Sequence, residues 1–423
     1  MKIMDDTEKN RIWQEIKEYA EASASELSEL RRDFHRHPEL GWMEFRTSGR
    51  IADLLHLYGC DEVLTGQQVC KAEARMGVPE GGGMTGVIGI LHCGVGPTIA
   101  LRFDIDALPV KECEDQDHFP AQEGFRSEQE GYMHACGHDG HITVGLGTAK
   151  ILCQIREQLH GTVKFIFQPA EEGVRGARAI VENGHLEDVD FLLGAHMYGG
   201  SEQHPHGICI TAGHGLATTK LDVDFHGKAS HAAAAPEQGN NALLAAATAV
   251  LNLQAIPRHG QADTRINVGK LVAGSGRNII CDAAHMELEV RGKTSEANQY
   301  MQTYAERIVK CAAEMHGCTA KTHLMGTALS SSNSSELNDR LEQVCADQLK
   351  IPVWRDPEAF SNVSEDFSCM SEAVKSHGGQ ACYFLNVSRC SAPLHNDRFD
   401  FQEEALVNGV KAFCGMTAEL LKT

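Results

Sequence analysis

The chain lacks any long apolar run. No stretch approaches the ~20 uninterrupted apolar residues that a membrane-spanning helix needs, so we expect no membrane partner. The first residues, Met1-Lys-Ile-Met-Asp-Asp, also lack the basic and then apolar layout of a secretory signal. These two absences predict a cytoplasmic protein.

Positive charge is scarce as well. The 38 lysines and arginines are outnumbered by 58 aspartates and glutamates, which gives a formal net charge of −20. Phosphate binding needs clustered Lys and Arg side chains, and no such cluster is visible, so we exclude nucleic acid as a partner. The net charge says little about a small substrate, because distant charges are screened within ~8 Å at physiological salt.

A disulfide framework, internal repeats and low-complexity tracts are also absent. The 15 cysteines are scattered, and in a reducing compartment such thiols are structural, metal-binding or incidental rather than paired. The chain does have length and apolar content. Its 423 residues, 42% of them hydrophobic, exceed what a single core usually holds, so two domains are expected.

The first half of the chain has the patterns of helices followed by strands. Apolar residues repeat with a helical period over residues 11–60, interrupted by Pro38. The apolar runs 87–91 and 98–103 flank a short glycine-containing segment and predict a hairpin. The later elements are a helix near 142–155 and strands at 162–167 and 190–196. This arrangement predicts a mixed α/β sheet with helices on both faces and a site along its carboxyl edge.

The pattern changes after residue 216. The expected elements are a strand at 220–226, a helix at 238–255, strands at 264–272 and 285–291, a helix at 294–316 and a strand at 319–325. This βαββαβ order predicts a two-layer ferredoxin-like domain. Helices near 335–349, 364–376 and 402–421 and a strand at 381–385 then complete the first domain. We therefore expect a catalytic domain of residues 1–216 and 327–423, interrupted by an inserted domain of residues 217–326.

One octet is rich in reactive side chains: His134-Ala-Cys136-Gly-His138-Asp139-Gly-His141. A Cys and a His separated by one Gly let a thiolate and an imidazole converge on one cation from a tight turn, which then opens into a helix. The alternative is a turn whose histidines are merely solvated. The octet alone does not decide between the two.

Further metal-ligand side chains follow at other strand ends. Gln168-Pro-Ala-Glu171-Glu172-Gly places two carboxylates side by side, and imidazoles follow at His196 and His395. Successive residues at a strand end point in different directions, so one glutamate can bind metal while the other transfers a proton. Either glutamate could instead be a solvated loop charge.

These motifs resemble the family of metal-dependent amidohydrolases that includes aminoacylases, hippurate hydrolases, auxin-conjugate hydrolases and, more distantly, glutamate-releasing carboxypeptidases. Further blocks in the same order carry the resemblance over nearly the whole chain: Arg32-Arg-Asp-Phe-His, Gly41-Trp-Met-Glu-Phe-Arg-Thr, Ser230-His-Ala, Gly274-Ser-Gly-Arg-Asn and Ser364-Glu-Asp. The resemblance is strongest to the branch that acts on p-aminobenzoyl-glutamate. It implies a catalytic domain with an inserted lid or dimerisation domain.

The resemblance implies two divalent metal ions per chain, with Zn or Mn the most favoured. The implied ligands are Cys136, His138, Glu172, His196 and His395. The implied general base, and later acid, is Glu171. Such a metal pair binds a water, lowers its pKa toward ~7 and holds the oxyanion that forms.

Two aspartates have implied supporting roles. Asp106 would orient a ligand imidazole, and Asp139 would hold a ligand by a hydrogen bond. A strand-end cap and a helix N-cap are the respective alternatives. Asp104 stands where distant relatives have a histidine ligand, so in this chain the Cys136 and His138 pair takes over that role.

The inserted domain carries the other implied site residues. In the family, the histidine at the position of His231 reaches the active site of a neighbouring protomer, where it stabilises the oxyanion. Asn278 and Arg291 match positions that hold the substrate carboxylate, which Arg can do with two hydrogen bonds. A plain tight turn is the alternative for the segment that contains Asn278. The implied partners are a second copy of the chain, bound through the inserted domain, or a homologous second subunit.

Together these features predict a metal-dependent amidohydrolase that cleaves an N-acyl amino acid, with an aroyl-glutamate such as p-aminobenzoyl-glutamate as the leading substrate. Indole-3-acetyl-aspartate or another N-acyl amino acid is the nearest alternative. Two other classes stay open: a cysteine hydrolase with Cys136 as nucleophile, and a noncatalytic partner subunit that keeps the fold.

Overall fold

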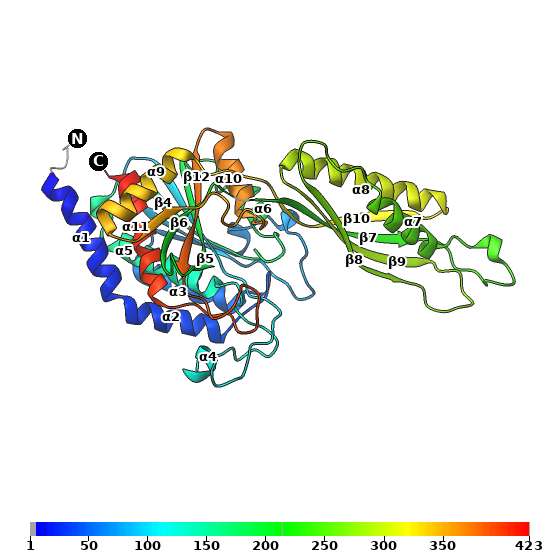
Figure 1. Cartoon of the computed structure of the whole chain (residues 1–423), viewed down its shortest axis with the longest axis horizontal. Helices are drawn as coiled ribbons and strands as arrows, with labels where there is room; N and C mark the ends of the chain where they lie inside the picture. The colour runs from blue at the N-terminus through cyan, green and yellow to red at the C-terminus, as the bar shows by residue number, and fades with distance from the viewer. Residues whose placement is uncertain (1–5, 214, 423) are drawn as a thin grey trace.

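The computed structural model describes residues 6–213 and 215–422, which form two units joined end to end (Figure 1). The larger unit contains both ends of the described chain, and the smaller unit extends away from it. Residues 1–5, the greater part of the N-terminal stretch that lacks the layout of a secretory signal, lie outside the described residues. Within the described ranges, no helix has the length and apolar character needed to cross a bilayer.

The larger unit is built on an eight-stranded mixed sheet with the strand order β1-β2-β4-β3-β5-β12-β6-β11. The four central strands β4, β3, β5 and β12 are parallel, whereas β2 and β6 run antiparallel to their central neighbours. The strands are β1 (Glu62–Thr65), β2 (Val87–His92), β3 (Thr98–Asp104), β4 (Thr162–Gln168), β5 (Phe191–Gly199), β6 (Gly207–Ile210), β11 (Val353–Arg355) and β12 (Gln380–Ser388). The predicted mixed sheet is confirmed.

The predicted hairpin is wrong, because β4 lies between β2 and β3. The turn that joins β2 to β3 is bonded to the start of β4: the Cys93 N–H donates to the Gly161 carbonyl, and the Thr162 N–H donates to the Pro97 carbonyl. Gly161 has φ +119°, and a Cβ there would lie 2.2 Å from the Pro97 oxygen. This glycine lets β4 pass close to the turn and pair with both β2 and β3. Their proximity in the sequence had predicted that β2 and β3 pair with each other.

Helices cover both faces of this sheet. One face carries α1 (Asp6–Ala22), α2 (Ala24–Arg36), α3 (Phe45–Tyr58), α5 (His138–Gln154), α9 (Ser335–Gln343) and α11 (Glu404–Leu421). The other face carries α6 (Ala177–Val181) and α10 (Phe367–Ser376). A short helix, α4 (Phe119–Gln122), lies on an excursion away from the sheet. Residues 344–349 continue α9 as a π-helix, so the predicted helix at 335–349 is continuous but irregular.

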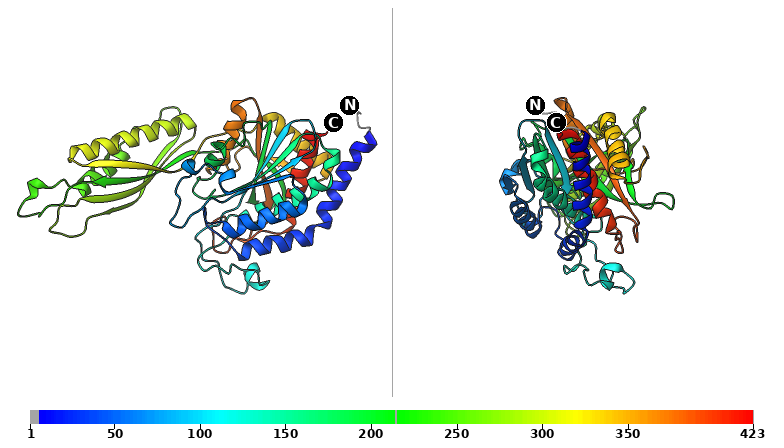
Figure 2. Two further views of the ribbon diagram at one scale, coloured as in Figure 1. Left: turned by 180° about the vertical axis from the view of Figure 1, so that it is seen from behind. Right: turned by 90° about the vertical axis from the view of Figure 1, so that its left-hand side faces the viewer.

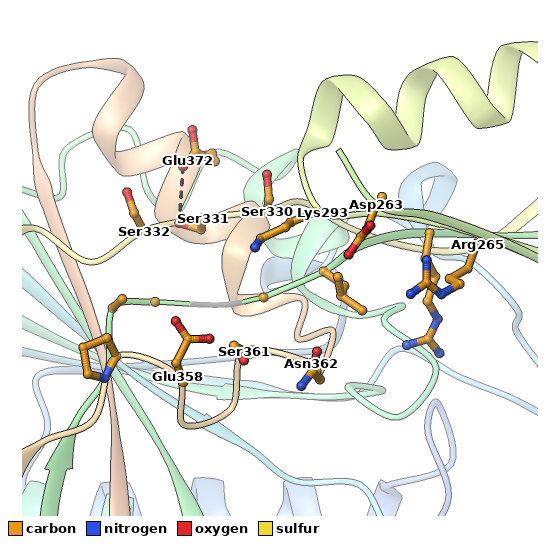
Figure 3. A pocket seen from close by; sticks show the side chains of 17 residues that line it. Asp263, Arg265, Lys293, Ser330, Ser331, Ser332, Glu358, Ser361, Asn362 and Glu372 are labelled. Carbon is orange, nitrogen blue, oxygen red and sulfur yellow. Dashed lines mark hydrogen bonds between the residues drawn. The ribbon is translucent and has the colours of Figure 1, made fainter. Parts of the chain in front are cut away.

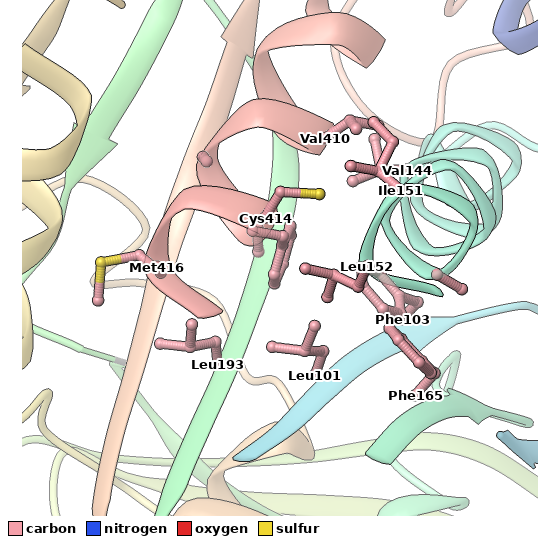
Figure 4. Close-up of a cluster of buried hydrophobic side chains, with 14 of the residues drawn as sticks. Leu101, Phe103, Val144, Ile151, Leu152, Phe165, Leu193, Val410, Cys414 and Met416 are labelled. Carbon is pink, nitrogen blue, oxygen red and sulfur yellow. The ribbon is translucent and has the colours of Figure 1, made fainter. Parts of the chain in front are cut away.

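The core between α5, α11 and the sheet fixes where α5 begins. Leu101 and Phe103 of β3 lie beside Leu152 of α5 and Cys414 of α11 (Figure 4). Each such buried Leu or Phe side chain stabilises the fold by about 1.5–3 kcal/mol. A Cβ at Gly145 would lie 2.6 Å from the Phe103 ring, so this glycine lets α5 approach the sheet closely.

The smaller unit has the predicted βαββαβ order. It consists of β7 (Ala217–His226), α7 (Ala242–Gln254), β8 (Thr264–Ala273), β9 (Ala283–Gly292), α8 (Ser295–Met315) and β10 (Thr319–Ala328). The strands form an antiparallel sheet in the order β10-β7-β9-β8. Both helices lie on one face of this sheet (Figure 2). The opposite face carries polar side chains, and we call it the open face.

Candidate metal centre

Three parallel strands bring reactive side chains to one edge of the large sheet. Asp104 ends β3, Glu171 and Glu172 follow β4, and His196 lies on β5. Because the carboxyl ends of parallel strands meet at one sheet edge, these residues converge. The helix α5 begins at His138 beside them.

The octet forms a tight turn at this edge. Gly137 has φ +85°, a left-handed conformation that favours glycine. The turn places the Cys136 thiol and the His138 imidazole in one group with His196, in which the ligand atoms all lie within 4.8 Å of one another. The Cys136 Sγ lies 3.4 Å from His196 Nε2.

A second group shares the same thiol. Cys136, Glu172 and His395 also place their ligand atoms within 4.8 Å of one another. His395 Nε2 lies 3.3 Å from Cys136 Sγ and 3.6 Å from Glu172 Oε1. The five residues that the sequence singled out as ligands therefore form two adjacent groups with Cys136 in common.

The protonation of the imidazoles suits metal binding. The Nδ1 of His138 lies 2.8 Å from the Asp106 carbonyl, and the Nδ1 of His196 lies 2.6 Å from the Met197 carbonyl. A carbonyl only accepts, so each Nδ1 donates, and the Nε2 lone pair of each ring faces the centre. His138 Nε2 and Glu172 Oε1 are buried and have no hydrogen-bond partner among the described residues. A cation satisfies such atoms, so this donor set fits divalent metal.

The loops that carry the ligands are held in unusual backbone conformations. Ala170 has φ 51° and His395 has φ 65°, which costs non-glycine residues of order 1 kcal/mol or more. The Asp106 carboxylate accepts hydrogen bonds of 2.9 Å from the backbone N–H groups of Glu171 and Glu172. Asp106 thus acts mainly on the glutamates: its carbonyl orients His138, whereas its carboxylate holds the turn.

Glu171 lies deeper than Glu172 and faces other acids. Its carboxylate forms a compact group with Glu365 and Asp366. Burial, followed by Glu365 and Glu172, raises the pKa of Glu171 well above its usual range. Burial also raises the pKa of Glu172, to about 7. A carboxyl group with a raised pKa is suited to accept and return a proton near neutral pH.

Sequence reasoning missed the buried arginine that supports this acidic group. Arg102 on β3 donates to Gln168 at 2.8 Å, to Asp104 at 2.7 Å and to Glu365 at 2.8 Å. The signal was present as a lone Arg within the apolar run Thr98-Ile-Ala-Leu-Arg-Phe. The Glu365-Asp366 pair also had a signal, because Ser364-Glu-Asp is one of the blocks that carry the family resemblance.

The role predicted for Asp139 is wrong. Its carboxylate accepts hydrogen bonds from Arg31 at 2.9 Å and His35 at 2.8 Å, and neither of these is a candidate ligand. Asp139 is the second residue of α5, and its side chain joins α5 to α2 rather than to the candidate ligands. His141 takes the nearer position: its Nε2 accepts the backbone N–H of Met197, next to His196.

The three site residues predicted on the smaller unit fall at opposite ends of it. His231 and Asn278 lie together, because the Ala232 N–H donates to the Asn278 carbonyl. The segment between β7 and α7, which contains His231, lies at the end far from the larger unit (Figure 1). Arg291 lies at the other end of β9, about 27 Å along the strand from Ala283 at ~3.4 Å per residue. One chain therefore does not bring Asn278 and Arg291 to the same carboxylate.

Arg291, on β9, lies beside the hinge, which we define as residues 211–213 and 215–216 between β6 and β7 together with residues 329–334 between β10 and α9. A pocket of about 570 Å³ opens there, lined by residues of both units that include Arg291, Lys293, Ser331 and Glu358. Lys293 and Ser330 are both among the side chains that line this pocket (Figure 3). The Arg291 guanidinium is bonded to both oxygens of Glu289, at 3.0 and 3.1 Å.

Sequence comparisons place the chain among hydrolases. A model of the peptidase family M20/M25/M40 matches residues 100–419. The chain is 40% identical over 426 residues to one of the subunits of p-aminobenzoyl-glutamate hydrolase of Escherichia coli, covering 94% of this chain and 96% of that protein. It is 39% identical over 422 residues to the indole-3-acetyl-aspartic acid hydrolase of Enterobacter agglomerans, with the same two coverages.

Solved structures agree with the sequence comparisons. An aminobenzoyl-glutamate utilization protein from Klebsiella pneumoniae matches with a TM-score of 0.78 at 34% identity, over 96% of this chain and 98% of that one. A Bacillus subtilis dinuclear metal-binding peptidase of the M20 family matches with a TM-score of 0.68 at 28% identity, over 95% of this chain and 99% of that one.

Proposed function

The chain belongs to the peptidase family M20/M25/M40 and is a metal-dependent hydrolase of amide bonds, and we propose that it cleaves N-acyl amino acids, with an aroyl-glutamate such as p-aminobenzoyl-glutamate as the leading substrate. The observation that carries the proposal is the pair of ligand groups that share the Cys136 thiol beside the buried Glu171.

We propose that two divalent cations, Zn or Mn, occupy this centre. Cys136, His138 and His196 would hold one, and Cys136, Glu172 and His395 the other. When bound, such a pair lowers the pKa of a coordinated water and polarises the substrate carbonyl. Thiolate and imidazole ligands suit Zn, and a carboxylate ligand is also compatible with Mn.

Glu171 carries the proton in this proposal. Its carboxylate accepts a proton from the attacking water and returns it to the leaving nitrogen as the amide C–N bond breaks. Asp106 fixes the Glu171 backbone through the 2.9 Å hydrogen bond. The acidic group behind it and the buried site keep the proton affinity of Glu171 high enough for this exchange.

The alternative of a cysteine nucleophile is less well supported. Burial, followed by the Glu172 and Glu171 carboxylates, raises the pKa of the Cys136 thiol well above its usual range, whereas a nucleophilic cysteine needs a lowered pKa. A noncatalytic partner subunit would have no need to retain both Glu171 and a complete ligand set. Indole-3-acetyl-aspartate stays the second candidate substrate, because an equally similar relative is the hydrolase of that conjugate.

We propose that the protein works as an assembly joined through residues 217–326, between catalytic segments 1–216 and 327–423. The His231 Nδ1 accepts the Ala233 and Ala234 N–H groups, so its Nε2 carries the proton and can donate to an oxyanion. His231 is exposed at the outer end of its unit, where a partner's metal centre can meet it.

The smaller unit also has the surface for such an assembly. Leu244 and Leu251 on α7 are 47% and 75% exposed, and Val272 on the edge strand β8 is 57% exposed. An apolar helix face beside an unpaired strand edge favours association. The partner is a second copy or a homologous second chain; the Escherichia coli relative is itself named as one subunit of its hydrolase.

A hydrolysis screen tests the proposal. The purified chain, alone and with Zn or Mn added, is incubated with N-acyl amino acids that vary in the acyl and amino halves, and release of the free amino acid is measured. We expect cleavage of aroyl-glutamates, its loss after chelation and its return with metal. Activity that survives complete metal removal but is abolished by a thiol-alkylating reagent would instead support the cysteine hydrolase.

A further inference from the structure

Lys220 on β7 lies beside the metal centre, although it belongs to the smaller unit. Its register partners are Glu289 on β9 and Gly326 on β10. Gly326 contacts the loop that follows Glu172: a Cβ at Gly326 would lie 2.1 Å from the Gly173 carbonyl oxygen. The next residue, Thr327, donates its N–H to Val174 at 2.8 Å. Lys220 therefore lies on the strand next to β10, and β10 contacts the loop that follows Glu171 and Glu172.

The Lys220 side chain extends from the open face, because its neighbours Thr219 and Leu221 point to the helix side. Its ammonium interacts electrostatically with Glu171, Glu289 and Glu172, and with His395. Burial lowers the pKa of Lys220, and these carboxylates oppose the shift. The charge therefore lies toward the metal centre, in a partly desolvated position.

Among the described residues, the Lys220 ammonium has no hydrogen-bond or ion-pair partner. Its cationic neighbours do. Arg291 is bonded to both Glu289 oxygens, and Arg175 donates to the Glu172 and Gly77 carbonyls, each at 2.9 Å. A partly buried charge without a partner is unfavourable, so Lys220 is the cation in this region with all of its donors left for a ligand, whereas Arg291 uses Nε and Nη2 on Glu289 and keeps its Nη1 donors.

A pocket of about 530 Å³ gives an anion access to Lys220. Its lining includes Lys220, Arg175 and Gly173 on the side of the metal centre. Two acids in the lining are already paired, Glu289 with Arg291 and Glu287 with Lys270 at 2.6 Å. Asp222 also lines the pocket, but it is two residues farther from the hinge along β7, about 7 Å at ~3.4 Å per residue.

We propose that Lys220 binds the side-chain carboxylate of an acidic amino acid, so that the enzyme selects N-acyl derivatives of glutamate or aspartate over those of neutral amino acids. This assignment rests on the proposed amidohydrolase function. A released acidic amino acid has two carboxylates, and the smaller unit presents two cations: Arg291 for the α-carboxylate and Lys220 for the second. A substrate with a neutral amino-acid side chain would leave the Lys220 ammonium without a partner.

The test compares kcat/KM for p-aminobenzoyl-glutamate and for p-aminobenzoyl-glutamine, which differ only in the charge of the side-chain terminus. We expect the wild type to prefer the glutamate by about 10- to 100-fold, the usual effect of one charge-assisted hydrogen bond. Lys220→Met should lose about that factor on the glutamate and change less than about threefold on the glutamine. Lys220→Arg should keep part of the preference.

Two controls separate this role from others. Lys310→Met removes an exposed lysine of α8, on the helix side of the smaller unit, and should change neither substrate. Arg291→Ala should weaken both substrates together, because both have the α-carboxylate. Metal content and thermal midpoint of each variant establish that it is folded.

The outcomes distinguish the two levels of the proposal. Equal losses on both substrates in a folded Lys220→Met enzyme, or a wild type without preference, would overturn the role of Lys220 while the amidohydrolase function stands. A wild type that cleaves no N-acyl amino acid with metal present would overturn the proposed function and this assignment with it.

Discussion

At the residue scale, two adjacent carboxylates have different surroundings although they share one turn. Asp106 holds the backbone N–H groups of both Glu171 and Glu172, and both carboxylates have an oxygen within 4.8 Å of a His138 ring nitrogen. Glu172 lies with Cys136 and His395, whereas Glu171 lies with Glu365 and Asp366. These different further neighbours are the physical basis for the proposal that one glutamate binds metal and the other transfers a proton.

Substitution of the proton-transfer residue and of a metal ligand should therefore have different effects on metal content and activity. Glu171→Gln should keep the metals but lower kcat on an aroyl-glutamate by on the order of 10² to 10⁴, the usual worth of a positioned acid/base.

Cys136→Ser should lower both metal content and activity, because a neutral hydroxyl replaces the thiolate shared by both ligand groups. Elemental analysis for about two ions per chain, with steady-state kinetics, checks both. Loss of metal in Glu171→Gln would mean that the two glutamates have been assigned the wrong way round.

At the scale of elements, a buried ionic network joins α2 to α5. His35 lies between two carboxylates, with ring nitrogens 2.8 Å from Asp139 and 3.0 Å from Glu112. Burial opposes the charged imidazole, but the hydrogen bonds with Asp139 and Glu112 outweigh burial and raise the pKa of His35 to about 9. The network holds the start of α5, and with it Cys136 and His138, at the sheet edge.

This network predicts how stability changes in mild alkali. Because the folded pKa of His35 is above the unfolded value of ~6.5, its contribution is complete below pH ~6.5 and is lost as pH rises through about 9. The free energy of unfolding should fall by up to about 3 kcal/mol over this window. Burial raises the pKa of Glu112, but the hydrogen bonds with His118 and His35 lower it to about 2, so its titration lies outside the window.

Urea unfolding at fixed metal content between pH 6 and 9.5 measures this effect. His35→Gln should remove most of the pH dependence and should also destabilise the protein at pH 6.5 by about 3–5 kcal/mol, because two buried carboxylates lose their partner. The matched control is His56→Gln, at an exposed histidine of α3, which should keep the wild-type profile. An unchanged profile in His35→Gln would assign the alkaline loss to other groups.

At the scale of the whole molecule, the residues predicted to form the active site lie in parts of the structure that one chain does not bring together. The five candidate ligands and Glu171 lie on the larger unit, and the segment that contains His231 lies at the far end of the smaller one (Figure 1). If His231 acts on a partner's substrate, activity depends on assembly. Two inactive variants should then complement one another.

Mixing His231→Ala chains with Glu171→Gln chains should restore activity. In a mixed symmetric dimer, one site has its own Glu171 and the partner's intact histidine, so random exchange should give about a quarter of wild-type activity. Mixing Cys136→Ser with Glu171→Gln is the control and should restore nothing, because both defects lie in the larger unit. Verified subunit exchange without regained activity would show that His231 does not act in trans.

The sequence by itself determined the order of elements and the set of candidate ligands that the structure brings together. The octet, the Glu171-Glu172 pair and His196 are local motifs at strand ends, and the carboxyl ends of parallel strands meet at one sheet edge. These features depend only on short-range periodicity, which is why they could be predicted without coordinates.

Long-range relations were decided only by the tertiary structure. Gly161 admits β4 between β2 and β3, so the neighbours in the chain are not neighbours in the sheet. Asp139 turns to Arg31 on another helix rather than to a ligand. The unpaired charge of Lys220 becomes visible only where β10 meets the loop after β4. Periodicity specifies the face on which a side chain lies, but its partner depends on which distant segment packs against that face.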